Sequence, residues 1–202
     1  MEKAVTGTFG PDRITETVEV IRSGGIAVLP TDTIYGMHCI ASNASAVNKV
    51  IGIKQRRGKS GLILLASDIS MVDDIVSLWP DDYRKRLDDI WPAPLTAILP
   101  AGKGIIPLLS PYGKVAVRIP DQKELRKVIE LLGEPVVSTS VNRSGSRPLT
   151  KMKDIRKTFS GLDIYLSKHG RGFSRPSTIV DCSKVPSVIL REGRCRGWDS
   201  RK

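Results

Sequence analysis

The feature that most constrains the fold is a strand, helix and strand in succession near the start of the chain. Residues 26–29 form a short apolar run that is typical of a buried strand. Residues 43–54 place apolar side chains at helical spacing, and residues 62–66 form a second apolar run. Because a helix between two buried strands packs against the sheet they share, this order predicts a crossover unit of an α/β domain.

The rest of the chain continues to alternate between the two periodicities. No internal repeat, linker or low-complexity tract interrupts it, so we expect one α/β domain over residues 1–202, with a basic C-terminal tail at 193–202. We expect further helices over residues 12–21, 68–76, 81–90, 122–132 and 150–159, and further strands over 36–41, 95–99, 115–119, 136–138, 164–166, 178–181 and 188–191.

Net charge indicates the kind of partner. The chain has 32 Lys and Arg residues against 21 Asp and Glu residues, a net charge of +11. This excess favours an anionic partner, either a nucleotide or a nucleic acid, although a basic solvated surface is the simpler alternative. The aromatic content of 5% supplies few stacking platforms for single-stranded nucleic acid. Charge alone does not choose between these partners.

Other compositional features exclude several classes of protein. No apolar run is long enough to cross a membrane and the N-terminus lacks the apolar core of a signal peptide, so we expect a cytoplasmic protein without a membrane span. Three widely spaced cysteines without a CxxC pair argue against a disulfide framework or a zinc site. No spacing of His, Cys and carboxylates predicts a metal cage, so we expect any Mg²⁺ to arrive with phosphate groups.

Hydroxyl groups follow two of the predicted strands. One set comes after residues 26–29 and another after the strand near residue 136, where an Asn adds an amide group. Polar surface turns would explain each set taken alone. Because strand ends are where open α/β sheets bind ligands, the pairing favours a site for a small polar ligand. The residues are Thr31, Thr33, Tyr35, Ser138, Ser140 and Asn142, with Ser177 before a third strand.

Cations occur in three places that could bind an anion. Lys54 and Arg56, followed by Arg57 and Lys59, lie at the end of a predicted helix, where a solvated basic helix end is the alternative explanation. Arg118 lies inside an apolar strand, where it either faces solvent or is held for an anion. Arg191 closes the last predicted strand.

Taken together, these segments resemble the YrdC family of threonylcarbamoyl-AMP synthases. The similarity extends over about residues 15–192. The matching segments are LPTDTIYG at 29–36, K-x-R at Lys54 and Arg56, WPAPLT at 91–96, VAVRIP at 115–120, S-x-N at Ser140 and Asn142, and PSTIVD at 176–181. The chain departs from the family pattern at His38 and Ile40, where Gly and Asp are usual, and at Arg57, Ser60, Gly61 and Ala93.

The resemblance implies a single-domain fold, in which a twisted mixed β-sheet with flanking helices surrounds a basic concave cavity. It implies a nucleotidyltransferase that makes threonylcarbamoyl-AMP and pyrophosphate from L-threonine, bicarbonate and ATP, with Mg²⁺ accompanying the ATP. The product would pass to the transfer machinery that modifies tRNA to threonylcarbamoyladenosine. The resemblance implies that Lys54, Arg56, Ser140 and Asn142 form a catalytic tetrad that binds the ATP phosphates, with Arg191 also contacting ATP. It assigns threonine to Thr31, Thr33, Tyr35, Arg118, Ser138 and Ser177.

Two other functions remain open at the level of sequence. A non-catalytic RNA-binding or ribosome-maturation protein would use the same basic cavity, because phosphates occur in both ligands. A related carbamoyl-adenylate enzyme would use the same phosphate site with a different amine.

Overall fold

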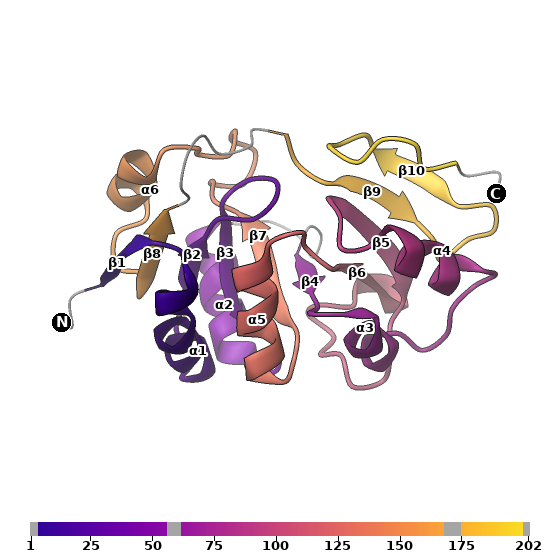
Figure 1. The fold of residues 1–202 in the computed structure, drawn as a ribbon, viewed down its shortest axis with the longest axis horizontal. Coiled ribbons are helices and arrows are strands. Elements are labelled where there is room, and N and C mark those ends of the chain that lie inside the picture. Colours follow the sequence, from indigo (N-terminus) through magenta and orange to yellow (C-terminus); the bar gives the residue numbers. More distant parts are fainter. Residues whose placement is uncertain (1–3, 56–61, 168–174, 200–202) are drawn as a thin grey trace.

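The computed structural model describes residues 4–55, 62–167 and 175–199. Within them the chain forms one mixed sheet, six α-helices and two short 3₁₀ helices (Figure 1). The strands are β1 (Val5–Thr8), β2 (Ala27–Leu29), β3 (Gly36–Ile40), β4 (Ile63–Leu65), β5 (Leu95–Pro100), β6 (Lys114–Arg118), β7 (Val136–Ser140), β8 (Ile164–Ser167), β9 (Thr178–Asp181) and β10 (Val188–Arg191). The helices are η1 (Pro11–Arg13), α1 (Ile14–Arg22), α2 (Ala44–Ile53), α3 (Ile69–Ile75), α4 (Tyr83–Ile90), η2 (Pro111–Gly113), α5 (Lys123–Leu132) and α6 (Met152–Thr158).

The sheet is mixed and its strands are ordered β1-β8-β2-β3-β7-β4-β6-β5-β9-β10. Strands β2 and β3 form an antiparallel hairpin, in which Leu29 pairs with Gly36, and residues 30–35 form its loop. The predicted crossover exists, and it runs from β3 through α2 to β4. Strands β3 and β4 lie on either side of β7 in the sheet. The crossover therefore does not start from the strand at residues 26–29. The short polar segment after Pro30 turns the chain back before the helix can begin.

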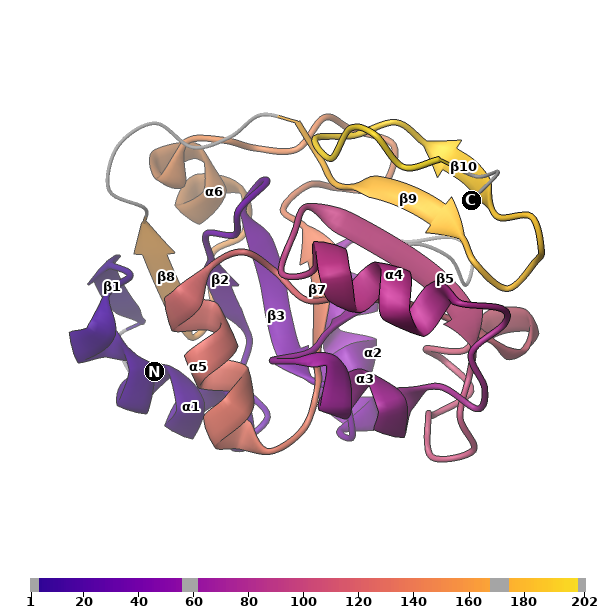
Figure 2. The same cartoon turned by 45° about the vertical axis from the view of Figure 1, so that its right-hand side comes forward.

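Helices cover both faces of the sheet. Helices α1 and α5 lie side by side on one face, whereas α2 lies behind β3 on the other (Figures 1 and 2). Strand β3 divides its side chains between the two faces, since Met37 and Cys39 join the α2 core while Ile40 joins the core under α1 and α5. Side chains at even-numbered positions of β3 therefore face the α1 and α5 side.

Local sequence explains some of the helix ends. The Asn43 side chain accepts a hydrogen bond from the Ala46 amide at 3.1 Å and caps α2. Gly133 ends α5 in the left-handed conformation at φ 77°. Some bounds differ from prediction: α6 begins at Met152 without a side-chain cap, and β7 extends to Ser140. β1 was not predicted because its four residues show little apolar alternation.

The segment after β10, up to residue 199, packs against the rest of the protein and does not form a loose tail. Trp198 is only 8% exposed, and the Arg86 guanidinium lies 4.4 Å from its ring centroid. Arg86 also donates to the Asp199 carbonyl at 2.6 Å. These contacts bring the C-terminal segment alongside β9 and β10 (Figure 2). None of the helices in the described ranges is long and apolar enough to cross a bilayer.

Candidate functional site

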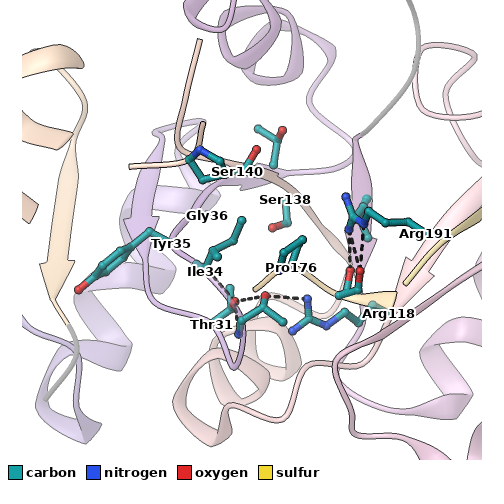
Figure 3. Close-up of a pocket in the computed structure, with 14 residues that line it drawn as sticks. Thr31, Ile34, Tyr35, Gly36, Arg118, Ser138, Ser140, Pro176 and Arg191 are labelled. Atoms are coloured by element: carbon teal, nitrogen blue, oxygen red, sulfur yellow. Dashed lines mark hydrogen bonds between the residues drawn. The ribbon is translucent and has the colours of Figure 1, made fainter. Parts of the chain in front are cut away.

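A pocket of about 280 Å³ opens between the β2–β3 loop and the strands on either side of it (Figure 3). Its wall combines the end of β7, the end of β6, the start of β9 and the end of β10. Most of the sequence-predicted site residues line it, although they come from positions far apart in the chain. They are Thr31, Thr33, Tyr35, Arg118, Ser138, Ser140, Ser177 and Arg191.

The β2–β3 loop is held in shape by its own hydroxyl groups. Thr31 and Thr33 are 7% and 3% exposed, and their hydroxyl oxygens lie 2.9 Å apart. The Thr31 hydroxyl donates to the Ile34 carbonyl at 2.8 Å and accepts from the Thr33 amide at 3.0 Å. These local hydrogen bonds satisfy the polar groups of a buried turn and hold the Thr33 side chain in an orientation that faces Arg118.

Arg118 is buried and does not face solvent. Its Nη2 donates to Asp32 Oδ1 and its Nη1 donates to Thr33 Oγ1 at 3.1 Å, while the side chains of Arg118 and Asp32 are 5% and 7% exposed. Burial lowers the pKa of Arg118 and the Asp32 carboxylate opposes that shift, so the guanidinium stays charged. Arg118 Nε and Asp32 Oδ2 form no hydrogen bond within the described residues, so Nε–H can still donate to a ligand and Oδ2 can still accept from one.

Asp32 is therefore a site residue that the sequence analysis left unassigned. The signal was present, because a cation inside an apolar strand requires a buried counterion. Sequence alone could not show that the β2–β3 loop lies over the end of β6.

A second cluster joins the end of α2 to the turn after β7. Lys54 is 3% exposed, and its ammonium donates to the Ser140 carbonyl at 2.5 Å, the Asn142 carbonyl at 3.1 Å and Asn142 Oδ1 at 2.9 Å. The Ser140 hydroxyl donates to the same Oδ1 at 2.5 Å. Three of the four residues predicted to bind phosphate are thus in contact. The fourth, Arg56, lies outside the described residues, as do Arg57, Lys59, Ser60 and Gly61.

Arg191 reaches the pocket from β10. A register shift between Ile189 and Arg191 interrupts the pairing with β9, and the Arg191 guanidinium donates to the Ser177 carbonyl at 2.9 and 3.1 Å. Partial burial lowers the pKa of Arg191. The Ser177 hydroxyl lies 2.9 Å from that of Thr96. Arg191, predicted to contact ATP, thus lies against a residue predicted to contact threonine.

The C-terminal segment contributes one residue that the sequence analysis missed. Arg194 Nη1 donates to the Asp32 carbonyl at 2.6 Å, and its amide donates to the Pro176 carbonyl at 2.9 Å. It therefore ties the β2–β3 loop to the start of β9. No local pattern distinguishes Arg194 from the other cations between residues 191 and 202.

Tyr35 differs from the other predicted residues. It lines the pocket, but its side chain belongs to the hydrophobic core, and in Figure 3 its ring points away from Ser138 and Arg118. Its carbonyl accepts from the Val141 amide at 3.3 Å, so its backbone joins the loop to the end of β7. Among the described residues, no group of three His, Cys, Asp or Glu side chains is placed to hold a metal ion.

Fold and site together define a mixed-sheet α/β protein with a small polar pocket between arginines and hydroxyl groups. A family model described as "Telomere recombination" (Sua5_yciO_yrdC) matches residues 19–193. The chain belongs to this Sua5/YciO/YrdC family.

Known relatives agree with this assignment. The threonylcarbamoyl-AMP synthase of Neisseria gonorrhoeae is 33% identical over 165 residues, which are 80% of this chain and 86% of the relative. E. coli YciO superposes with a TM-score of 0.84 at 26% identity, with 96% of each chain covered. P. abyssi Sua5, solved in complex with L-threonine, gives a TM-score of 0.84 at 26% identity over 94% of this chain, which spans 56% of the Sua5 chain.

Proposed function

We propose that this protein is a threonylcarbamoyl-AMP synthase, which converts L-threonine, bicarbonate and ATP to threonylcarbamoyl-AMP and pyrophosphate. The observation that supports it best is the junction at Ser140. This residue lines the small pocket and also donates to Asn142 in the Lys54 cluster. A site for an amino acid and a site for phosphates would thus be continuous. The similarity to synthases at 33% identity supports the same activity.

The pocket suits the amino-acid substrate. Arg118 would bind the threonine carboxylate through its unpaired Nε–H edge, since a guanidinium recognises carboxylates through paired donors. The hydroxyl groups of Thr33, Ser138 and Ser177 would surround the amine and the side-chain hydroxyl, with Thr31 holding the loop. P. abyssi Sua5, which shares this fold, was solved in complex with L-threonine, and this supports threonine as the amino acid.

The Lys54 cluster suits the phosphates. Its ammonium would exchange some of its carbonyl partners for phosphate oxygens, with Ser140, Asn142, Arg191 and the undescribed Arg56 as further donors. Mg²⁺ would enter as part of the nucleotide substrate, because it usually binds through substrate phosphates and few protein carboxylates.

The proposed reaction places little demand on acid–base groups. The threonine amine and bicarbonate give a carbamate and one molecule of water, as the new N–C bond replaces a C–O bond of bicarbonate. A carbamate oxygen then forms a bond to the α-phosphorus of ATP. The bond from that phosphorus to the bridging oxygen breaks, and both electrons leave with pyrophosphate. The protein would position the two anions and neutralise the charge that develops on the leaving group.

The test is release of pyrophosphate from MgATP by the purified protein, with each substrate omitted in turn. We expect release only when L-threonine and bicarbonate are both present, with threonylcarbamoyl-AMP detected by mass spectrometry. Absence of the adenylate, under conditions where the N. gonorrhoeae enzyme makes it, would overturn the proposal. Replacing threonine with other amines in the same assay tests for a related carbamoyl-adenylate enzyme.

The proposed product would serve the modification of tRNA to threonylcarbamoyladenosine by downstream transfer enzymes, and we infer that the protein works with them in the cytoplasm. The net charge of +11 also favours direct contact with RNA. A non-catalytic RNA-binding role would instead give tight RNA binding with a steep salt dependence that is unaffected by ATP and threonine.

A further inference from the structure

His38 is a buried polar residue that the proposed reaction does not use. Its side chain comes from the middle of β3 and is 0% exposed. Neither ring nitrogen meets full hydrogen-bond geometry within the described part of the chain, but the Leu29 backbone lies close enough to act as an acceptor for one of them. The other nitrogen is buried without a partner, and such groups are rare in folded proteins, so it requires an explanation.

The sheet register places His38 directly beside the pocket. His38 is paired with Ser138 across β3 and β7, so the two side chains lie on the same face. Gly36, two positions earlier in β3, also lies on this face and lines the pocket with Ser138. A Cβ atom added to Gly36 would lie 2.6 Å from His38 Nε2 and 3.0 Å from Ser138 Oγ.

Nε2 and the Ser138 hydroxyl therefore both lie within 3.0 Å of the same point beside Gly36, a residue that lines the pocket. Ser138 Oγ forms no hydrogen bond among the residues that the structure describes, so its hydroxyl is available for a new partner. Because Gly36 has no side chain, no Cβ atom occupies the point that both groups approach, and a rotation of the Ser138 side chain toward Nε2 would pair them.

The charge state of His38 defines its chemistry. Burial lowers the pKa of His38 to about 3, and the nearby Arg118 adds to this effect. A group with so low a pKa is neutral at physiological pH and a poor proton acceptor in catalysis. It can still accept or donate one hydrogen bond at each nitrogen.

We propose that His38 is a positioning residue whose Nε2 accepts a hydrogen bond from the Ser138 hydroxyl and thereby turns the Ser138 lone pairs toward the amine of the substrate. The identity of that substrate rests on the proposed function. The pocket has two cations, Arg118 and Arg191, to bind carboxylate and phosphate, so the amine needs an acceptor. A serine whose proton is held by His38 is such an acceptor, whereas an unrestrained serine can also donate.

The experiment compares wild type with His38→Leu, His38→Gln, Ser138→Ala and the His38→Leu/Ser138→Ala double variant. L-Threonine affinity is measured by titration calorimetry, and the KM values for threonine and ATP by pyrophosphate release. We expect His38→Leu and Ser138→Ala each to weaken threonine binding about fivefold, the loss of one hydrogen bond. The double variant should lose no more than Ser138→Ala, because His38 acts through Ser138.

Three controls separate positioning from a structural role. His38→Gln, which can restore an acceptor near Nε2, should bind threonine within about twofold of wild type. The KM for ATP should change by less than about twofold in all variants. Without substrate, His38→Leu should unfold at or above the wild-type temperature, since in this structure it replaces a buried ring nitrogen that has no partner among the described residues with an apolar group.

Histidine ¹⁵N spectra test the tautomer without any activity assay. We expect an unprotonated Nε2 that shifts when L-threonine is added. Additive losses in the double variant, an Nε2–H tautomer in the bound state, or wild-type threonine affinity in His38→Leu would each overturn the proposal. If threonine binds as expected but no adenylate forms, the proposed function fails and the positioning role stands. If the wild type does not bind threonine, both are wrong.

Discussion

Lys54 Nζ donates to Asn142 Oδ1 at 2.9 Å and so joins the end of α2 to the turn after β7 across 88 positions of the chain. The same ammonium holds two backbone carbonyls of that turn. Lys54 therefore organises the proposed phosphate site as well as supplying charge to it. This double role defines the first prediction.

Lys54→Ala and Asn142→Ala should each lower the rate of pyrophosphate release at least about tenfold, which corresponds to about 1.4 kcal/mol of transition-state stabilisation. The fold-loss in rate of the Lys54→Ala/Asn142→Ala double variant should be smaller than the product of the two single fold-losses, because the residues act as one unit. Lys49→Ala is the matched control, since Lys49 is an exposed lysine on the same helix. Wild-type rates in both single variants would place the phosphate site elsewhere.

The buried ion pair between Arg118 and Asp32 predicts an asymmetric effect on stability. Asp32→Asn should reduce the free energy of unfolding by about 3 kcal/mol or more, because it leaves Arg118 buried without a counterion. The double variant Asp32→Asn/Arg118→Met should recover much of that loss in urea denaturation while remaining inactive. Glu130→Gln, in the exposed pair with Lys127, is the control and should have little effect. Equal losses at the two pairs would contradict this prediction.

Gly36 is required for space and not for an unusual backbone angle. Gly36→Ala should destabilise the protein by about 1–3 kcal/mol, because its Cβ would lie 2.6 Å from His38 Nε2. It should also weaken threonine binding. Gly52→Ala, inside α2 with no atom within 4 Å of the new Cβ, should instead stabilise by about 0.4–1 kcal/mol. Urea denaturation of both variants checks the difference in sign.

His38 predicts a particular dependence of stability on pH. Its folded-state pKa of about 3 lies below its unfolded value of 6.5, so only the unfolded chain binds the proton between these values. The contribution of His38 to the free energy of unfolding is therefore complete above pH 6.5. It falls by about 1.4 kcal/mol for each pH unit below that value. Unfolding free energies of wild type and His38→Leu between pH 7 and pH 5 test this, because the variant should lack that part of the slope. Parallel curves would show that folding does not lower the pKa of His38, which would contradict the prediction.

Trp198 predicts that the C-terminal segment contributes to the fold. Trp198→Ala should reduce the free energy of unfolding by about 3–5 kcal/mol, because the side chain is 8% exposed and contacts Arg86. Tyr112→Ala is the aromatic control, since Tyr112 is 96% exposed and its loss should change stability by less than about 0.5 kcal/mol. Denaturant unfolding measures both, and an unchanged midpoint in Trp198→Ala would mean that the segment does not stabilise the fold.

Most of the secondary structure could be predicted from local sequence. The cap at Asn43 and the stop at Gly133 depend on residues within one helical turn, so the sequence specifies them directly. The hydroxyl groups after residues 29 and 136 also predicted side chains that the structure brings to one pocket. β1 escaped prediction because its pairing with β8, distant in the chain, stabilises it more than its own pattern does.

The sequence by itself determined the α/β class, the residues that could bind an anion and the similarity to a known family, because these depend on residue types and local spacing. Only the tertiary structure decided which groups meet. It paired Arg118 with Asp32, placed His38 opposite Ser138 on the neighbouring strand and brought Arg194 to the β2–β3 loop. These contacts join segments that are far apart in the chain. They are determined by strand order and register, which local sequence patterns leave open.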